Sequence, residues 1–151
     1  MEKSVNTLSD LDKIIQAFDL EEQDYRSYSA LTLAYIGDAI YDLVIRSIVI
    51  FHSGKSVNDL HKKTTRFVKA ETQAVMVQGL WDNDILTEEE RAVYKRGRNT
   101  KSNTMAKNAS IIAYRKATGF EALLGYLYVT EQMERLLELV KTGLTYTDLV
   151  L

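Results

Sequence analysis

The sequence predicts an all-α fold, and three features lead to this expectation. The 151 residues include no proline, although a β-rich fold of this length would normally carry proline in turns and edge strands. Apolar residues recur at the spacing of a helix face, and no segment alternates between apolar and polar residues as a half-buried strand does. Capping residues stand directly before several of the periodic segments. We therefore expect helices joined by short loops.

The expected helices follow in chain order. A short amphipathic helix covers residues 10–18. A long helix, apolar almost all round, covers 29–51 and should form the centre of the fold. Residues 52–55 break it. The segment from Ser56 to Asp59 then has the form of a capping box and predicts a helix that ends near Leu80.

The second half of the chain continues in the same way. Residues 87–90 form a second capping box, which predicts a short helix to about Arg96. A polar loop is expected at 97–103 and a helix at 104–116. Gly119 predicts a break, after which a last helix runs from 120 to about 141.

The composition excludes several classes of function. The absence of cysteine rules out a disulfide framework, zinc ribbons and thiol catalysis. Asp38, Asp42 and Arg46 interrupt the most apolar stretch, and each would cost about 2.5–3.5 kcal/mol at the centre of a bilayer. The first residues do not have the apolar core of a signal peptide. We expect a cytoplasmic protein without a membrane segment.

Charge is distributed unevenly along the chain. Residues 1–28 carry seven acids and three bases, and we expect them to form an acidic N-terminal segment packed on a domain that spans 29–151. Two segments are basic: 55–69 has five bases and one acid, and 95–107 has five bases and no acid. The net charge of -2 therefore conceals two surfaces that suit a polyanionic partner. Ordinary solvated surface is the alternative for the segment 95–107.

Two acidic residues stand in apolar surroundings on two of the expected helices. Asp38 follows Gly37, and a glycine costs a helix interior about 1 kcal/mol relative to alanine, so its presence suggests close approach by another segment. Glu121 is the only charged residue between positions 117 and 128, and Gly125 lies one turn after it. A carboxylate in such surroundings must be paired or must bind a cation.

The two carboxylates together suit Mg²⁺, which binds through one or two protein carboxylates and a substrate phosphate. A metal held in this way can polarise a phosphodiester and supply a hydroxide. Structural alternatives stay open. Glu121 could form a salt bridge with a buried arginine, and Asp42 could pair with Arg46 on the wet side of the central helix.

These residues carry a family resemblance. The sequence Tyr35-Ile-Gly-Asp-Ala39, followed by an apolar helix, resembles the signature helix of ribonuclease III. The sequence Phe120-Glu-Ala-Leu-Leu-Gly125 resembles the second metal-binding helix of the same family. The order and separation of the motifs also match, and the likeness runs from about Ser29 to Leu139.

Two departures narrow the resemblance. The signature of typical members begins with two glutamates, whereas the stretch from Leu31 to Ala34 has none. Typical members also have an aspartate three residues before the second-motif glutamate, where this chain has Thr118. We further expect no double-stranded-RNA-binding domain after the catalytic domain. A lone catalytic domain with this reduced signature looks like the Mini-III ribonucleases, and the number of metal ions per site is left open.

The resemblance implies an α-helical homodimer of the ribonuclease III type, whose catalytic domain would span 29–151. It implies Mg²⁺, with Mn²⁺ as a substitute, bound by the catalytic residues Asp38 and Glu121. It implies cleavage of double-stranded RNA in the maturation of 23S ribosomal RNA ends, with a ribosomal protein as a further candidate partner. The residues expected to contact RNA are basic or polar and lie in the two basic segments: Lys62, Lys63, Arg66, Lys95, Arg96, Arg98, Asn99, Lys101 and Lys107.

Two other functions remain as alternatives. An all-α nucleotide pyrophosphohydrolase also uses helix carboxylates and Mg²⁺, and Glu131 and Glu134 have the spacing of its ExxE motif. A catalytically inactive ribonuclease-III-like scaffold that binds RNA is the non-enzyme alternative. The presence of both Asp38 and Glu121 speaks against the scaffold.

Overall fold

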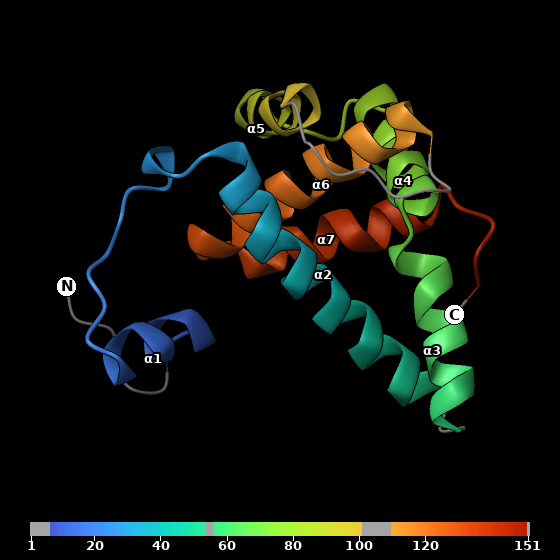
Figure 1. Ribbon diagram of the computed structural model, residues 1–151, viewed down its shortest axis with the longest axis horizontal. Helices are drawn as coiled ribbons and strands as arrows, with labels where there is room; N and C mark the ends of the chain where they lie inside the picture. The colour runs from blue at the N-terminus through green and yellow to red at the C-terminus, as the bar shows by residue number, and fades with distance from the viewer. Residues whose placement is uncertain (1–6, 54–55, 101–109, 151) are drawn as a thin grey trace.

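The computed structural model describes residues 7–53, 56–100 and 110–150, and within these ranges all regular secondary structure is helical. The predicted all-α class is confirmed. Figure 1 shows the arrangement of the elements. They are α1 (Asp10–Ala17), the 3-10 turn η2 (Tyr25–Ser27), α2 (Ala30–Ser53), α3 (Val57–Val68), α4 (Ala70–Asp82), α5 (Glu88–Asn99), α6 (Ile111–Val129) and α7 (Met133–Leu144). No helix in the described ranges is long and apolar enough to span a bilayer.

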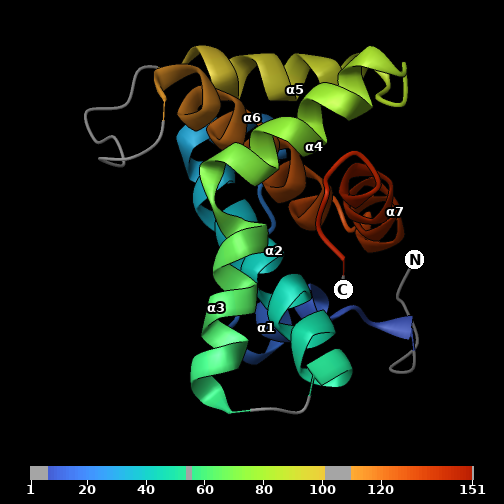
Figure 2. The same cartoon turned by 90° about the vertical axis from the view of Figure 1, so that its right-hand side faces the viewer.

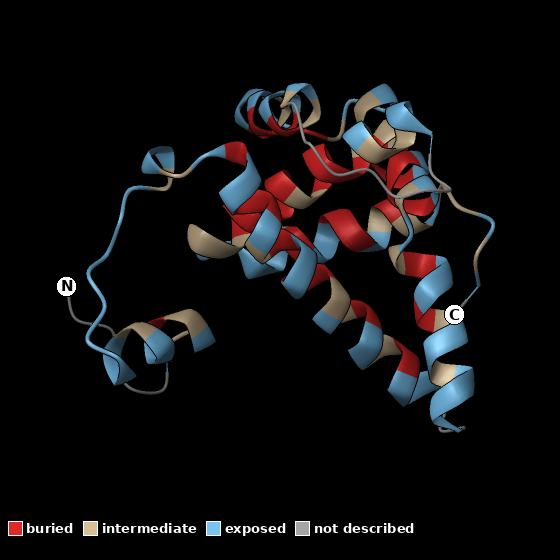
Figure 3. Cartoon of the chain, in the orientation of Figure 1, coloured by how far each residue is buried: buried red, intermediate tan, exposed pale blue. Residues whose placement is uncertain are grey.

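Helix α6 is the centre of the fold. It packs against α2, α4, α5 and α7, which surround it in the two views of Figures 1 and 2. From Ala117 to Leu127 every residue of α6 is buried except Glu121, which is partly buried. Figure 3 shows this buried centre in red. The apolar character of the segment therefore comes from contact with four neighbours, and a single carboxylate interrupts it.

Helices α2 and α6 touch through their main chains at two glycines. A Cβ atom built on Gly37 would lie 1.7 Å from the carbonyl oxygen of Glu121. A Cβ atom built on Gly125 would lie 1.9 Å from the carbonyl oxygen of Leu33. Neither position can hold a larger residue unless the two helices move apart. The prediction that these glycines permit close approach is confirmed.

Several predicted boundaries are wrong. The expected last helix at 120–141 is the end of α6 followed by α7, because the chain turns between Val129 and Met133 and Glu131 has a positive φ of 57° there. The expected helix at 104–116 does not run through Ser110, which is extended and caps α6.

The predicted helix from Ser56 to Leu80 is two helices, because Lys69 is extended (φ -64°, ψ 154°) and separates α3 from α4. Gly119 does not break a helix, since α6 runs through it. Gly119 instead allows α5 to come close, and a Cβ there would lie 2.7 Å from the carbonyl oxygen of Tyr94. Helix α5 continues to Asn99, so residues expected in a loop lie in its last turn.

Three side chains satisfy the carbonyl groups at the end of α3. The last carbonyls of a helix have no partner within it and must find one elsewhere. The hydroxyl of Thr72 donates to the carbonyl of Arg66 at 2.6 Å, and the hydroxyl of Tyr41 donates to that of Phe67 at 2.7 Å. The amide of Gln73 donates to the carbonyl of Val68 at 2.8 Å. The break at Lys69 is therefore held by α2 and by the first turn of α4.

A buried ion pair joins α5 to α7. The guanidinium of Arg135 donates to both carboxylate oxygens of Glu90, at 2.8 and 2.9 Å, and Glu90 is 4% exposed. Burial alone would raise the pKa of Glu90, but the hydrogen bonds from Arg135 and from the Thr87 N–H outweigh it and hold this pKa below its ordinary value.

The N-terminal segment contacts the helical body at a few points. The hydroxyl of Ser9 donates to the carboxylate of Glu131 at 2.6 Å. The ring of Tyr25 meets that of Tyr126 edge-on, with 4.8 Å between centroids, and its hydroxyl hydrogen-bonds to Glu89. Figure 1 shows α1 to one side of the other helices.

Candidate active site

The structure brings Asp38 and Glu121 together where α2 and α6 touch. Asp38 directly follows Gly37, and Gly37 packs against the main chain of Glu121 itself. The two carboxylates therefore extend from the closest point between the helices. Asp38 is exposed and Glu121 is partly buried, so the pair lies at the edge of the core with one side open to solvent.

The surroundings of Glu121 disfavour its negative charge. Burial of its carboxyl, followed by the effect of the neighbouring carboxyl of Asp38, raises the pKa of Glu121 from 4.5 to about 8. The amide of Gln73 acts in the opposite direction to a smaller extent. A cation between the two carboxylates would relieve both effects, because it offsets the lost hydration and the mutual repulsion.

The donor set fits a magnesium ion held by two carboxylates. The family positions that usually carry further carboxylates add none here. Ala34 is buried, and the hydroxyl of Thr118 donates to the carbonyl of Tyr114 at 3.0 Å. No cluster of three or more candidate metal ligands occurs in the described ranges. Mg²⁺ commonly binds through only one or two protein carboxylates and keeps several waters, so these residues are sufficient.

The structural alternatives are resolved differently for the two helices. Arg46 pairs with Asp42 at 2.8 Å, as the sequence suggested, so this part of the polar side of α2 is an ordinary surface ion pair. Within the described part of the chain, no lysine or arginine lies in ion-pair distance of Glu121, and the alternative of a salt bridge to a buried arginine has no support there.

Gln73 lies beside the carboxylate pair, and the sequence alone did not indicate this. Its Nε2 lies 3.5 Å from Oε2 of Glu121, and the side chain is buried. A glutamine in the first turn of a helix is ordinary in a sequence. Only the packing of α4 against α6 places it beside a carboxylate 48 positions away.

The predicted RNA-contacting residues of α3 lie on its outer side. Lys62 and Arg66 are exposed and one turn apart, and Lys63 is partly buried. Figure 2 shows α3 on the same side of the molecule as the carboxyl end of α5.

The second basic segment is the end of a helix rather than a loop. Lys95, Arg96 and Asn99 are exposed and Arg98 is partly buried, all in the last turns of α5. Basic residues at this end, with three glutamates in the first turn, match the helix dipole and so stabilise α5. Lys101 and Lys107 lie outside the described residues.

Two aromatic rings and one main-chain carbonyl contact the basic side chains of α5. The guanidinium of Arg98 lies 5.5 Å from the ring centroid of Tyr94, and the ammonium of Lys95 lies 5.7 Å from that of Trp81. Arg96 donates to the carbonyl of Tyr28 at 3.4 Å. The positive charges are thereby held at the surface by groups that carry no negative charge.

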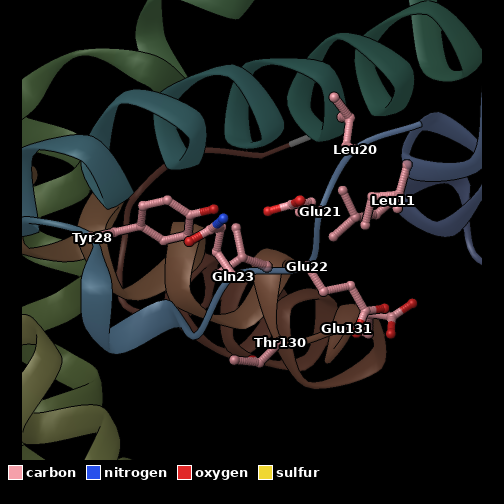
Figure 4. Close-up of a pocket in the computed structure, with 10 residues that line it drawn as sticks. Leu11, Leu20, Glu21, Glu22, Gln23, Tyr28, Thr130 and Glu131 are labelled. Carbon is pink, nitrogen blue, oxygen red and sulfur yellow. The ribbon is translucent and has the colours of Figure 1, made fainter. Parts of the chain in front are cut away.

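A hollow of about 270 Å³ between the N-terminal segment and the end of α6 does not suit a phosphate (Figure 4). Its charged lining is acidic, from Glu21, Glu22 and Glu131, and Leu11 and Leu20 contribute apolar surface. None of the predicted site residues lines it. Its charge would repel RNA, so the candidate site remains at the crossing of α2 and α6.

The structure removes the support for an ExxE motif. Glu131 has a positive φ of 57° and lies in the turn between α6 and α7, before α7 begins at Met133. Glu131 and Glu134 are therefore not one turn apart on a helix, which that motif requires.

Comparisons with known proteins agree with the fold and show the family. The model of the ribonuclease III domain matches residues 31–132, a range that includes both carboxylates. The Mini-ribonuclease 3 of Clostridium tetani is 51% identical over 124 residues, covering 82% of this chain and 81% of the relative. That of Enterococcus faecalis is 49% identical over 118 residues, covering 78% and 89%.

A solved structure supports the same assignment. The crystal structure of a protein from Fusobacterium nucleatum superposes with a TM-score of 0.72 at 29% identity and covers 82% of this chain and 97% of that one. With the family model, the close relatives and the all-helical fold in agreement, the chain belongs to the ribonuclease III family and, within it, to the Mini-ribonuclease 3 group.

Proposed function

We propose that this endoribonuclease cleaves double-stranded RNA and uses Mg²⁺ bound by Asp38 and Glu121. The observation that carries the proposal is the pairing of these carboxylates at the crossing of α2 and α6, where the pKa of Glu121 rises to about 8. A site with two unneutralised acids is costly unless a cation occupies it. The chain belongs to a family of phosphodiester hydrolases, so the cation has a catalytic use.

The residues of the chain have distinct roles in this proposal. When bound, Mg²⁺ supplies positive charge that polarises the phosphodiester and favours hydroxide formation near neutral pH. Asp38 and Glu121 hold the ion, and Gly37 and Gly125 fix the main chains that carry them. The apolar neighbours of Glu121 limit its hydration, which strengthens its attraction for a cation.

The basic residues of α3 and α5 supply the attraction for RNA. Duplex RNA is bound mainly through phosphates and 2′-hydroxyls, which suits lysine, arginine and asparagine side chains without sequence preference. We assign phosphate contacts to Lys62, Lys63 and Arg66 on α3. We assign the same role to Lys95, Arg96, Arg98 and Asn99 on α5 and to Lys101 and Lys107 beyond it.

We also propose a two-fold homodimer formed through α2. Four large apolar residues are exposed on the solvent side of this helix, alongside the Asp42–Arg46 ion pair: Leu31, Tyr35, Leu43 and Ile50, with Tyr35 81% exposed. A second copy would cover this side. The two strands of an RNA duplex are related by local two-fold axes, so a symmetric dimer presents one site to each strand.

Five narrower proposals accompany this function. We propose that the substrate is a precursor of 23S ribosomal RNA, with a ribosomal protein as a candidate partner, and that Mn²⁺ can replace Mg²⁺. We propose that the chain consists of an acidic N-terminal segment, residues 1–28, and a catalytic domain, residues 29–151. The family match to residues 31–132 lies inside the second part. We place the protein in the cytoplasm.

The test is cleavage by variants in which one carboxylate loses its charge. Asp38→Asn and Glu121→Gln should fold, bind duplex RNA and fail to cleave it with Mg²⁺. Asp42→Asn is the matched control, because Asp42 lies one turn from Asp38 on α2 and forms a surface ion pair with Arg46. Single-stranded RNA and nucleoside triphosphates serve as alternative substrates. Near wild-type cleavage by either site variant, or a preference for nucleotides, would refute the proposal.

A further inference from the structure

Gln73 is a buried polar residue beside the carboxylate pair. It is 2% exposed and lies in the first turn of α4. Its Nε2 donates to the carbonyl of Val68 at 2.8 Å and lies 3.5 Å from Oε2 of Glu121. One side-chain amide therefore connects the end of α3 with the carboxylate that extends from α6.

The two neighbours fix the orientation of this amide. Nε2 carries two hydrogens, and two acceptors lie within its reach, one carbonyl oxygen and one carboxylate oxygen. A flipped amide would place Oε1 against both of these oxygens, so only one orientation is compatible with them. In that orientation Oε1 is buried and has no hydrogen-bond partner in the described ranges. Such an oxygen destabilises the folded protein.

The unpartnered oxygen argues against a purely structural role for Gln73. The neighbouring carbonyls of α3 are satisfied by the hydroxyls of Thr72 and Tyr41, and neither of these side chains leaves a buried oxygen unpartnered within the described ranges. If capping of Val68 were the only requirement, a residue with a donor and no unmatched acceptor would stabilise the fold better. The feature that distinguishes Gln73 from the other two side chains is its reach to Glu121.

We propose that Gln73 is a positioning residue that holds Oε2 of Glu121 and thereby orients this carboxylate toward the cation it shares with Asp38. The inference rests on the proposed function, since it presupposes a metal ion at the pair. At 3.5 Å the contact is long, so Gln73 steers the carboxylate without competing strongly with a cation. Hydrogen bonds to metal-binding side chains typically account for about 10–100-fold in metal affinity.

The experiment measures Mn²⁺ binding to the full chain without RNA, by the loss of the free-ion signal in electron paramagnetic resonance. Gln73→Met keeps the length and shape of the side chain but removes both the donor and the unpartnered oxygen. We expect the dissociation constant for Mn²⁺ to rise about 10-fold or more. The thermal midpoint of the metal-free protein should change by less than about 4 °C, because removal of the hydrogen bond and removal of the unpartnered oxygen offset each other.

Gln78→Met is the matched control on the same helix. Gln78 donates to Asp82 at 2.8 Å in an exposed part of α4, so its amide is engaged away from the carboxylate pair. This variant should bind Mn²⁺ as the wild type does. In cleavage assays, raising Mg²⁺ should restore the kcat of Gln73→Met, whereas Asp38→Asn should not be restored.

The outcomes separate this inference from the proposed function. If wild type binds Mn²⁺, Asp38→Asn does not, and folded Gln73→Met binds as wild type does, Gln73 has no positioning role and the metal site stands. If wild type itself shows no Mn²⁺ binding that depends on Asp38, the proposed metal site fails and the inference fails with it. Gln73→Leu is the second variant. Loss of the folded state in both Gln73 variants would assign Gln73 to the packing of α3 and overturn the inference.

Discussion

The charge of Glu121 destabilises the fold that carries it. Its carboxyl is the only charged group in the buried stretch of α6, and its pKa of about 8 means that the folded protein binds a proton there that the unfolded chain has already released. Between about pH 4.5 and 8 the folding stability therefore falls as pH rises. A residue kept at such a cost is typical of a functional site.

Glu121→Gln should raise the stability of the metal-free protein while it stops cleavage. The gain should be small near pH 4.5 and exceed about 1 kcal/mol at pH 8, because the variant has no charge to bury. Denaturant unfolding at both pH values measures the difference. Addition of Mg²⁺ should stabilise wild type and not the variant. A variant less stable than wild type at pH 8 would show that the carboxylate is satisfied without a cation.

Glu90→Gln should have the opposite effect on stability. The pKa of Glu90 lies below its ordinary value, so its pairing with Arg135 stabilises the fold above about pH 4.5, and this contribution disappears as pH falls through the pKa in the folded state. We expect a loss of about 3 kcal/mol at pH 7 and a smaller one below pH 4. Urea unfolding across this range is the measurement, and a loss independent of pH would contradict the ionic contribution.

The sequence drew attention to Asp38 and Glu121 as carboxylates in apolar stretches. It gave no indication of the tertiary contacts made by Gln73 and Glu90. Asp38 and Glu121 could be predicted because a carboxylate in an apolar stretch is unusual wherever the chain folds. The contact of Gln73 with Glu121 could not be predicted, because it depends on the placement of α4 beside α6. Glu90 was likewise hidden, since its partner Arg135 lies 45 positions away.

At the scale of helices, the contact between α2 and α6 positions the two carboxylates. The main chains meet at Gly37 and Gly125, so rotation of side chains cannot absorb an added methyl group. The spacing of the site is then a property of two helices in contact and not of a loop.

Gly37→Ala should destabilise the protein by about 3 kcal/mol or more and impair cleavage, because the new Cβ must displace the main chain of α6. Gly143→Ala is the control. There the nearest atoms are Cβ and Cε of Met76, at 3.1 and 3.2 Å, so a shift of a few tenths of an ångström accommodates the methyl group, and alanine favours the helix by about 1 kcal/mol. We expect its unfolding free energy to stay within about 1 kcal/mol of wild type. Equal losses of unfolding free energy in both variants would show that the contact between α2 and α6 at Gly37 does not require glycine more than the position of Gly143 does.

Helix starts were predicted well at the two capping segments that begin at Ser56 and Thr87, and boundaries were predicted poorly where packing decides. The capping box at Thr87 and Glu90 is present with both hydrogen bonds, and α5 starts where it indicates. Gly119 was interpreted as a break because glycine is unfavourable in helices, yet packing against Tyr94 requires a small residue in mid-helix. The break at Lys69 has no strong signal in the sequence, since the side chains that stabilise it come from α2 and α4.

The basic side chains in the last turns of α5 should contribute to the binding of RNA duplexes of any sequence. Arg96→Ala combined with Arg98→Ala should weaken binding, raise KM more than it lowers kcat, and reduce the salt dependence of binding by roughly one unit of slope for each phosphate that is no longer bound. Filter binding at several salt concentrations measures this. Lys141→Ala, at an exposed position of α7, is the control. Unchanged affinity and slope in the double variant would show that the end of α5 is solvated surface and that RNA binds elsewhere.

At the scale of the whole molecule, the proposed dimer depends on the exposed side of α2. Tyr35→Arg should weaken the proposed dimer by placing a charge in the covered surface. Light scattering should then report a mass near the 17.2 kDa of one chain instead of about twice that value. Leu137→Arg, on α7 and 45% exposed, should leave the mass unchanged. A wild-type monomer at assay concentration that cuts both strands would contradict the proposal.

Helix α2 carries Asp38 along one edge and the exposed apolar residues next to it, so a single helix would serve both the chemistry and the pairing of chains. With one cutting site per chain, dilution below the dissociation constant of the dimer would separate the two cuts in time. The enzyme would then nick one strand and release the duplex before the other is cut. The ratio of nicks to complete breaks would follow the amount of enzyme present, and the expression level of the protein would decide what kind of end its substrate receives.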